Sequence, residues 1–315
     1  MSTERFLLRG LLGAGLSLAL GGCGNDLAPA WDIRAFRLFG AKIENITRQP
    51  IDPGIAEAAP GEQVRLTLSF ADPDRTTARP VNVTWVFCAE ATVMGTTIGC
   101  TARGASVLTG TNVTYEVPRF EFSVDPSNRP RIQVIALACA GGVAALDPTT
   151  RQPRCQGEGS ESWVMTRSIL VRTTETAPPN HNPAIDRVKF IRSGLTTADA
   201  VTVGTDTPLH VPRCTTDPCA EHTLDVSVAM GSREIQSTLD LQGNRVMVQE
   251  RLQFGFFTDQ GTMQNTFRVD STVVPDGPVR NVWMAPREAS TVHFVFTAQD
   301  TRGGFDVVER TVVVD

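Results

Sequence analysis

The chain has 315 residues, of which 41% are hydrophobic and 20% are charged, and its formal net charge is −5 at pH 7. This apolar fraction can build packed cores and excludes wholesale disorder, and the length suits one large domain or two ordinary ones. The mild acidity, with no basic cluster along the chain, argues against nucleic acid as a partner.

The N-terminus has the organisation of an export signal. Residues 1–9 carry Arg5 and Arg9, and residues 10–20 form an apolar segment of 11 residues. A helix that spans a bilayer needs about 20 apolar residues. The segment therefore predicts a secretory signal and not a membrane span.

The sequence Leu20-Gly21-Gly22-Cys23 follows at once and resembles the lipobox of bacterial lipoproteins. The resemblance implies that Cys23 receives a diacylglycerol, that the chain is cut before it, and that the new amine is acylated. Several acyl chains would then anchor the remaining 293 of the 315 residues. Gly24, by resemblance to the enterobacterial sorting rule, favours the outer membrane over the inner. Ordinary cleavage after residues 28–30, or a coincidental cysteine, would be the alternatives.

After this signal, apolar and polar residues alternate with period 2 in nearly every segment that has the composition of an ordered one. Examples are residues 64–70, 81–87, 132–138 and 292–298. Such alternation predicts antiparallel strands with one buried and one wet face. Asp-Pro pairs, which favour turns, recur between these segments, and no helical period is convincing. The predicted fold class is all-β.

Residues 173–183 lack apolar alternation and contain three prolines, which predicts a short, stiff linker. Similar units lie on either side of it: one closes with a strand over residues 162–172, and the other ends in a hairpin turned at residues 300–304. The predicted organisation is a signal peptide (1–22), a lipidated tether (23–32), a first β-sandwich domain (33–173), a linker (174–183) and a second β-sandwich domain (184–315).

Three features resemble tandem immunoglobulin-like modules of bacterial surface proteins. They are Ala59-Pro60-Gly61-Glu62 before a strand, Trp85 on a strand like strand C, and the turn Asp300-Thr301-Arg302-Gly303-Gly304. The resemblance implies two antiparallel immunoglobulin-like sandwiches. Antibody domains carry a disulfide between strands B and F beside the tryptophan. By their parity, Cys88 and Cys139 are expected to point away from the core at strand ends, so this bond is predicted to be absent.

Six cysteines follow Cys23: Cys88, Cys100, Cys139, Cys155, Cys214 and Cys219. An even number is typical of a protein in an oxidising compartment. Fifteen pairings are formally possible, and the local ones are favoured, namely Cys88–Cys100, Cys139–Cys155 and Cys214–Cys219.

Two groups of residues raise the question of metal binding. His210, Cys214, Cys219 and His222 could form a tetrahedral structural zinc site. Their spacing is not that of a common zinc finger, and exported thiols usually oxidise, so a disulfide is favoured. Oxygen-bearing residues near turns resemble the calcium sites of cadherin-like modules, although turn formation also explains them. These residues are Asp72, Asp74, Asn180, Asn182 and Asp300. No cofactor or metal is predicted.

Catalytic motifs such as H-E-x-x-H and G-x-S-x-G are absent from the sequence. Trp85, Trp163 and Trp283 lie on strand-like segments, where core packing is expected, and Trp31 is expected at the membrane interface or against the first domain. The sequence therefore predicts a lipid-anchored cell-envelope protein, not an enzyme, with a binding, adhesion or scaffolding role. Its expected partners are the membrane, through the lipid, and envelope or extracellular proteins or glycans. The alternative is a protein that binds or degrades polysaccharides.

Overall fold

The computed structural model divides the chain into Met1–Ala30 and one compact unit, Trp31–Asp315, which holds every strand described below. Among the residues that the structure describes, no helix has the length and apolar character needed to cross a membrane. The described residues are 29–48, 52, 54–72, 79–89, 91–94, 97–100, 105–119, 130–146, 153–172, 178–205, 208–240, 242–270 and 277–315.

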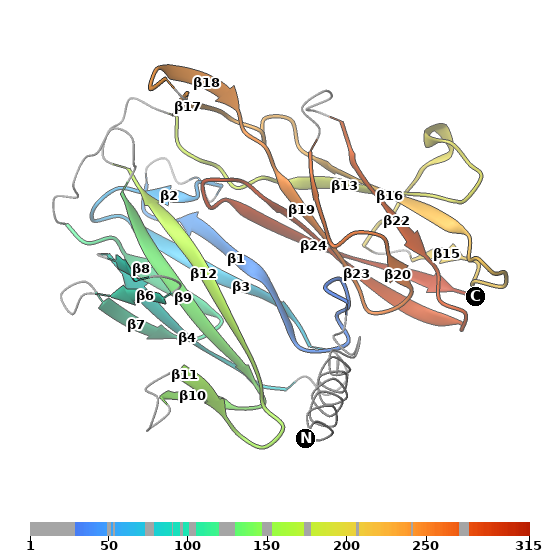
Figure 1. The fold of residues 1–315 in the computed structure, drawn as a ribbon, viewed down its shortest axis with the longest axis horizontal. Helices are drawn as coiled ribbons and strands as arrows, with labels where there is room; N and C mark the ends of the chain where they lie inside the picture. The colour runs from blue at the N-terminus through green and yellow to red at the C-terminus, as the bar shows by residue number, and fades with distance from the viewer. Residues whose placement is uncertain are drawn as a thin grey trace, which may run out of the picture. The chain divides into compact units, whose positions relative to one another are not determined.

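The first half of the compact unit, called the first module here, has two facing sheets (Figure 1). The smaller sheet has the order β1-β3-β8, with bounds Arg37–Asn45, Gln63–Ala71 and Asn112–Glu116. The larger sheet has the order β2-β12-β9-β4-β7, with bounds Glu57–Ala58, Glu161–Val171, Arg131–Ala140, Val81–Cys88 and Ala105–Thr109. Two short hairpins complete the module: β5 (Ala91–Met94) with β6 (Thr97–Cys100), and β10 (Val143–Leu146) with β11 (Pro153–Gln156).

The second module is built in the same way. One sheet has the order β14-β13-β16-β22-β20, with bounds Val201–Thr202, Ile185–Ile191, Glu221–Val228, Val279–Met284 and Thr262–Met263. The other has the order β15-β24-β23-β19-β21, with bounds Leu209–Val211, Phe305–Val314, Ser290–Gln299, Gln253–Thr258 and Phe267–Val269. A hairpin of β17 (Ile235–Leu239) and β18 (Arg245–Gln249) and a single 3₁₀ turn, η1 (Thr197–Asp199), lie outside these sheets.

The two modules share one topology. In each, a short strand (β2 or β15) pairs in parallel with the last strand of the module (β12 or β24), while the other pairings within the two main sheets are antiparallel. The larger sheet of the first module thus has the order A′-G-F-C-C′, and the smaller one has A-B-E. This is the arrangement of an immunoglobulin-like sandwich. The fold is therefore all-β with two antiparallel immunoglobulin-like sandwiches, as the sequence predicts.

Alternation places the apolar side chains between the sheets. On β3, Val64, Leu66 and Leu68 are buried in the first core, and on β9, Val134 and Ala136 face them. The second core is rich in phenylalanine, with Phe254, Phe256, Phe294 and Phe296 all at most 1% exposed. Because burying each such side chain contributes about 1.5–3 kcal/mol, these two cores account for the compactness of the modules.

Cys88 and Cys139 point away from the first core, as predicted, whereas the predicted wet face of one strand is wrong. Both cysteines are fully buried, yet neither belongs to the first core. Cys139 is covered by the β10–β11 hairpin, to which it is joined by the disulfide to Cys155. On β23, the predicted wet face is also largely closed: Thr297 is buried, and its same-face neighbour Val295 packs with residues of the first module. A second covering layer explains both cases.

Candidate functional site

The two modules meet in a small apolar cluster. Ile33 and Ala71 of the first module pack with Phe257 and Val295 of the second, and all four are at most 6% exposed. The rings of Phe39 and Phe257 pack against each other in a tilted arrangement, with 4.9 Å between their centroids. This contact, called the junction here, lies within the compact unit and fixes the modules to each other.

Polar side chains surround the apolar cluster of the junction. The Asn182 amide donates to the carbonyl oxygens of Ile43 (2.7 Å) and Gly54 (3.1 Å), both in the first module. Its Oδ1 accepts a hydrogen bond from the N–H of Phe305, the first residue of β24 (2.9 Å). One buried side chain therefore joins the two modules through three hydrogen bonds.

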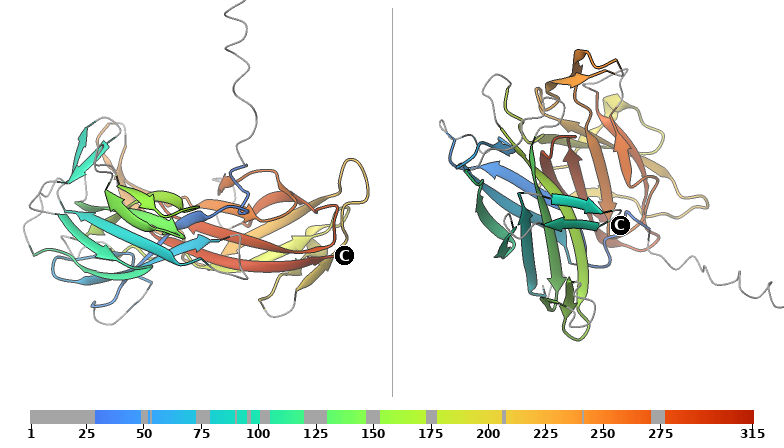
Figure 2. Two further views of the ribbon diagram at one scale, coloured as in Figure 1. Left: turned by 90° about the horizontal axis from the view of Figure 1, so that it is seen from below. Right: turned by 60° about the vertical axis from the view of Figure 1, so that its left-hand side comes forward.

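Strands β23 and β24 run from the second module toward the first (Figures 1 and 2). At the start of β24, Phe305 packs against Gly40 of the first module. The nearest atom of the Phe305 ring lies only 2.6 Å from the ideal position of a Cβ on Gly40, so a side chain there would collide with the ring. The Arg167 guanidinium lies over the same ring, 5.2 Å from its centroid. The Arg167 guanidinium donates to the carbonyl oxygens of Ala41 and of Gly303 in the turn. The glycine at position 40 is thus required by a close approach between modules.

A network of charged groups continues from the junction into the second module. His181 lies between two carboxylates, with Nδ1 at 2.6 Å from Glu234 and Nε2 at 3.2 Å from Asp52. Arg302 bridges Glu234 and Glu250, and the Glu250 side chain is only 1% exposed. The network includes described residues from both modules and from the connection between them.

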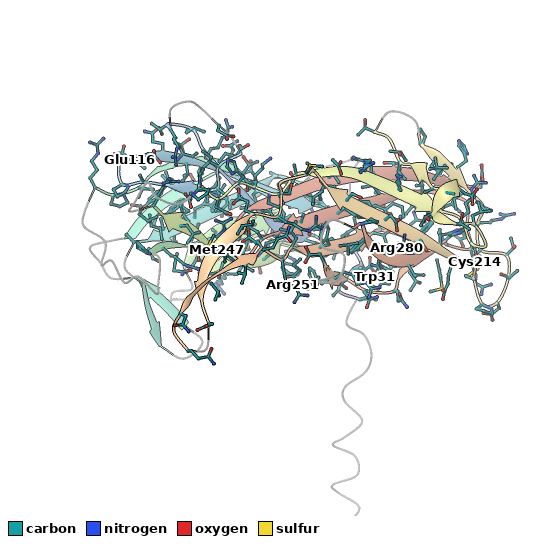
Figure 3. All side chains as sticks on the ribbon, turned by 90° about the horizontal axis from the view of Figure 1, so that it is seen from above. Trp31, Glu116, Cys214, Met247, Arg251 and Arg280 are labelled. Atoms are coloured by element: carbon teal, nitrogen blue, oxygen red, sulfur yellow. A yellow bond between two sulfur atoms is a disulfide. The ribbon has the colours of Figure 1, made fainter. Side chains whose placement is uncertain are left out.

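Beside these contacts lies a cleft of about 580 Å³, within the usual size range of ligand sites. The first module supplies the start of β9 and the middle of β12, and the second supplies the segment before β19, the end of β21 and the β23–β24 turn. Figure 3 labels Arg251 at this cleft and Cys214 at a separate place along the second module. The lining residues are Arg131, Thr166, Arg167, Ser168, Arg251, Leu252, Gln253, Val269, Gln299, Asp300, Thr301, Arg302 and Gly303.

Burial shifts two charged groups of the cleft. The Arg167 guanidinium is 8% exposed, and its burial lowers its pKa to about 10, although the charge of Asp300 opposes this change. Burial and, second, the charge of Glu250 raise the pKa of Asp300 to about 6. The backbone N–H groups of Arg302 and Gly304 donate hydrogen bonds to its Oδ1 and oppose this rise. Both groups are thus held in a poorly solvated place at the inner side of the cleft.

The predicted lipid-bearing residue, Cys23, lies outside the described residues. Two predicted disulfides are present, Cys139–Cys155 and Cys214–Cys219, with Cα atoms 5.5 and 5.3 Å apart. Cys88 is also disulfide-bonded. The side chain of its predicted partner, Cys100, is not among those described.

The zinc alternative is contradicted by the Cys214–Cys219 disulfide, because a metal would need these sulfurs as thiolates. His210 instead contacts Asp315 at 2.8 Å, and His222 is buried beside the rings of Phe190 and Trp283. Within the described ranges, no three His, Cys, Asp or Glu side chains are placed to hold a metal ion.

The residues that resembled calcium ligands have other roles. Asp72 pairs with Arg79, Asp300 closes the β23–β24 turn, and the Asn182 amide spans the junction. Asp74 lies outside the described residues. Asn180 is fully buried, and its backbone oxygen accepts a hydrogen bond from the N–H of Ala56 at 2.7 Å.

Two tryptophans differ from the sequence expectation. Trp31 packs against the core of the second module, not the first, because residues 31–33 pair with Thr258 at the end of β19. Trp163 is 38% exposed and lies under the guanidinium of Arg37 at 5.5 Å, so it is not a core residue. Trp85 and Trp283 are fully buried, as predicted.

The sequence interpretation missed the cleft and its arginines. One signal was available: Arg167 has the same parity on β12 as the core residues Ile169 and Val171. An arginine at an inward position of a strand needs a partner or a special site, because burying an unpaired charge is costly. Arg131 and Arg251, which are exposed, gave no such signal.

No family model matches the chain, and no curated protein matches it. Among solved structures, it is similar to the D00-D0 domain of intimin, at 9% identity and a TM-score of 0.21 over 87% of this chain and 99% of that one. Escherichia coli alpha-2-macroglobulin activated by porcine elastase follows at 10% identity and TM-score 0.21, over 88% of this chain and 22% of that one. Latent PorU from Porphyromonas gingivalis is 10% identical, with a TM-score of 0.19 over 87% of this chain and 34% of that one. At these values the similarities carry no argument about function.

Proposed function

We propose that this protein is a lipid-anchored, non-catalytic binding protein of the cell envelope, and that its ligand docks in the cleft between the two modules. The observation that carries the proposal is that both modules supply the lining of one cleft of ligand size. The junction contacts hold the two walls in place before a ligand arrives, which reduces the entropy lost on binding.

Binding, not catalysis, is proposed because of the side chains in the cleft. Its described lining offers hydroxyls, amides and guanidinium groups, which recognise ligands by hydrogen bonds, and contains no histidine, cysteine or glutamate. The four histidines of the chain contact other residues, as His181 and His222 illustrate. The hydroxyls, amides and guanidinium groups of the lining suit a ligand that carries polar groups of its own, whether an envelope protein or a glycan.

The proposed location depends on the lipobox and agrees with the disulfides. Two disulfides between described cysteines suit an oxidising compartment. Anchorage through Cys23, most consistent with the outer membrane by its Gly24 neighbour, would place both modules outside the cytoplasm.

Replacing Cys23 by serine tests the anchor. The wild-type protein is expected to incorporate radiolabelled palmitate and to sediment with membranes. The C23S variant should do neither, because the acyl chains provide the membrane affinity. A C219S variant serves as the control, since it also removes one sulfur but should remain labelled. A C23S variant that stays membrane-bound would contradict the proposal.

Filling the cleft tests the binding role. Thr166 is an exposed lining residue on β12, so T166W should place an indole in the cleft without disturbing the core. We expect the full-length wild-type protein to retain a component of envelope extracts, identified by mass spectrometry and carbohydrate analysis, and T166W to retain it at least about 10-fold less. Thr114, exposed on β8, provides the matched control T114W. Equal capture by T166W and T114W would show that the ligand binds elsewhere.

A further inference from the structure

The cleft carries a positive charge that the whole protein does not. Four arginines and one aspartate line it, while the chain has a formal net charge of −5. Arg302 is neutralised by Glu234 and Glu250, and Arg251 shares Asp270 with Arg233. The excess positive charge of the cleft therefore comes from Arg131 and Arg167 and, in part, from Arg251.

Arg131 and Arg167 have no carboxylate within ion-pair distance among the described residues. Arg131 is exposed at the start of β9. Arg167 is buried, and its bonds go to two neutral carbonyl oxygens and to the face of the Phe305 ring. Its Nε has no described partner at all. A buried cation that only Asp300 partly compensates, from beyond ion-pair distance, raises the free energy of the folded state, and an anion nearby would lower it.

The cleft also offers neutral polar groups, and its volume is in the range of small-ligand sites. Thr166 contributes a hydroxyl group, and Gln253 and Gln299 contribute amides. The hydroxyls of Ser168 and Thr301 already donate to Gln133 and Glu250, so they can only accept hydrogen bonds from a ligand. The volume of about 580 Å³ exceeds what a lone ion needs and has room for a sugar or a similar polar group as well. Guanidinium groups bind phosphate oxygens with paired, charge-assisted hydrogen bonds.

We propose that the cleft binds a phosphate-bearing ligand, with Arg131 and Arg251 contacting the phosphate from the exposed side and Arg167 providing positive charge from the buried side. The inference rests on the proposed binding role and names the class of ligand for that site. Asp300, the one carboxylate of the described lining, lies on the β23–β24 turn and lowers the positive charge of the cleft near Arg167.

The test is calorimetric titration of the full chain in a nonionic detergent with pyrophosphate, at low and at physiological ionic strength. We expect saturable binding of one pyrophosphate per chain, weakened by salt. The variant R131Q/R251Q should bind at least about 10-fold more weakly, because it loses two charge-assisted contacts. Arg167 is left unchanged because its bonds to Ala41 and Gly303 join the modules.

The matched control removes the same charge elsewhere. Arg187 and Arg287 are exposed and lie outside the cleft lining, so R187Q/R287Q should bind within about 2-fold of wild type. Equal weakening in both double variants, or no saturable binding by wild type, would overturn the inference. So would citrate binding more tightly than pyrophosphate, since it would assign the site to carboxylates.

Two further titrations identify the source of the phosphate. Tighter binding of glucose 1-phosphate than of inorganic phosphate would support a sugar phosphate held by the hydroxyl and amide lining, and equal binding would support recognition of the phosphate group alone. If T166W abolishes capture from envelope extracts but pyrophosphate does not bind, the binding role stands and the phosphate inference fails.

Discussion

Replacing Arg302 by methionine is expected to lower the free energy of unfolding by about 3–5 kcal/mol. The Arg302 side chain is 8% exposed and donates hydrogen bonds to Glu234 and, at 3.1 and 3.2 Å, to Glu250. Methionine fills a similar volume but leaves Glu250, whose side chain is only 1% exposed, without its ion-pair partner, and leaves Glu234 with His181 alone. Urea denaturation at pH 7, with the slope checked for two-state behaviour, measures the change.

A double variant separates charge from packing. In R302M/E250Q the most deeply buried carboxylate is also neutral, so this protein should recover at least about 1 kcal/mol relative to R302M. R287M, at an exposed arginine 3.8 Å from Asp217, should lie within about 0.5 kcal/mol of wild type. If R302M is as stable as R287M, the buried network does not stabilise the junction.

Replacing Asn182 by alanine is expected to cost about 2–4 kcal/mol. The variant leaves the Phe305 N–H without its acceptor and the Ile43 oxygen without this donor, and unsatisfied buried groups cost about 1–3 kcal/mol each. Because these bonds join the two modules, their loss should also weaken the cooperativity of unfolding. Thermal denaturation followed by calorimetry measures both effects, as a lower midpoint and a broader or divided transition.

The matched control for Asn182 is Asn112. Asn112 is exposed on β8 and donates one hydrogen bond at 3.3 Å to Thr67, so N112A should change stability by less than about 0.5 kcal/mol. A single unchanged transition in N182A, equal to that of N112A, would mean that the modules are held together mainly by the apolar cluster around Phe257 and Val295.

Much of each module follows from local pattern. Alternation on the segments around Leu66, Trp85 and Val134 identified strands and their inward faces correctly, because a strand side chain that points into its own sandwich repeats every second residue. The disulfides Cys139–Cys155 and Cys214–Cys219 were predictable because they close loops with separations of only 16 and 5 residues. Short loops lose little entropy on closure.

The same pattern misled wherever a second layer covers a sheet. Thr297 reads as a solvent-facing residue beside Phe296, yet it is buried. Cys139 does point away from its own core, as predicted, but the pattern did not reveal that the hairpin with its disulfide partner covers it. Trp163 shows the reverse error, since an aromatic residue on a strand was expected in the core and is partly exposed. Period 2 reports which residues share a face, and it does not report what lies against that face.

The sequence by itself determined an all-β chain of two sandwiches with locally closed disulfides, and it contains Leu20-Gly21-Gly22-Cys23, the resemblance to a lipobox from which an envelope location is proposed. Only the tertiary structure revealed the junction, with Asn182 bonded to Phe305 123 positions later, and the arginine-lined cleft beside it. The physical reason is the range of the interactions. Strand faces and short disulfides depend on neighbours in the chain, whereas Arg131, Arg167 and Arg251 become one site only when two complete cores have packed against each other.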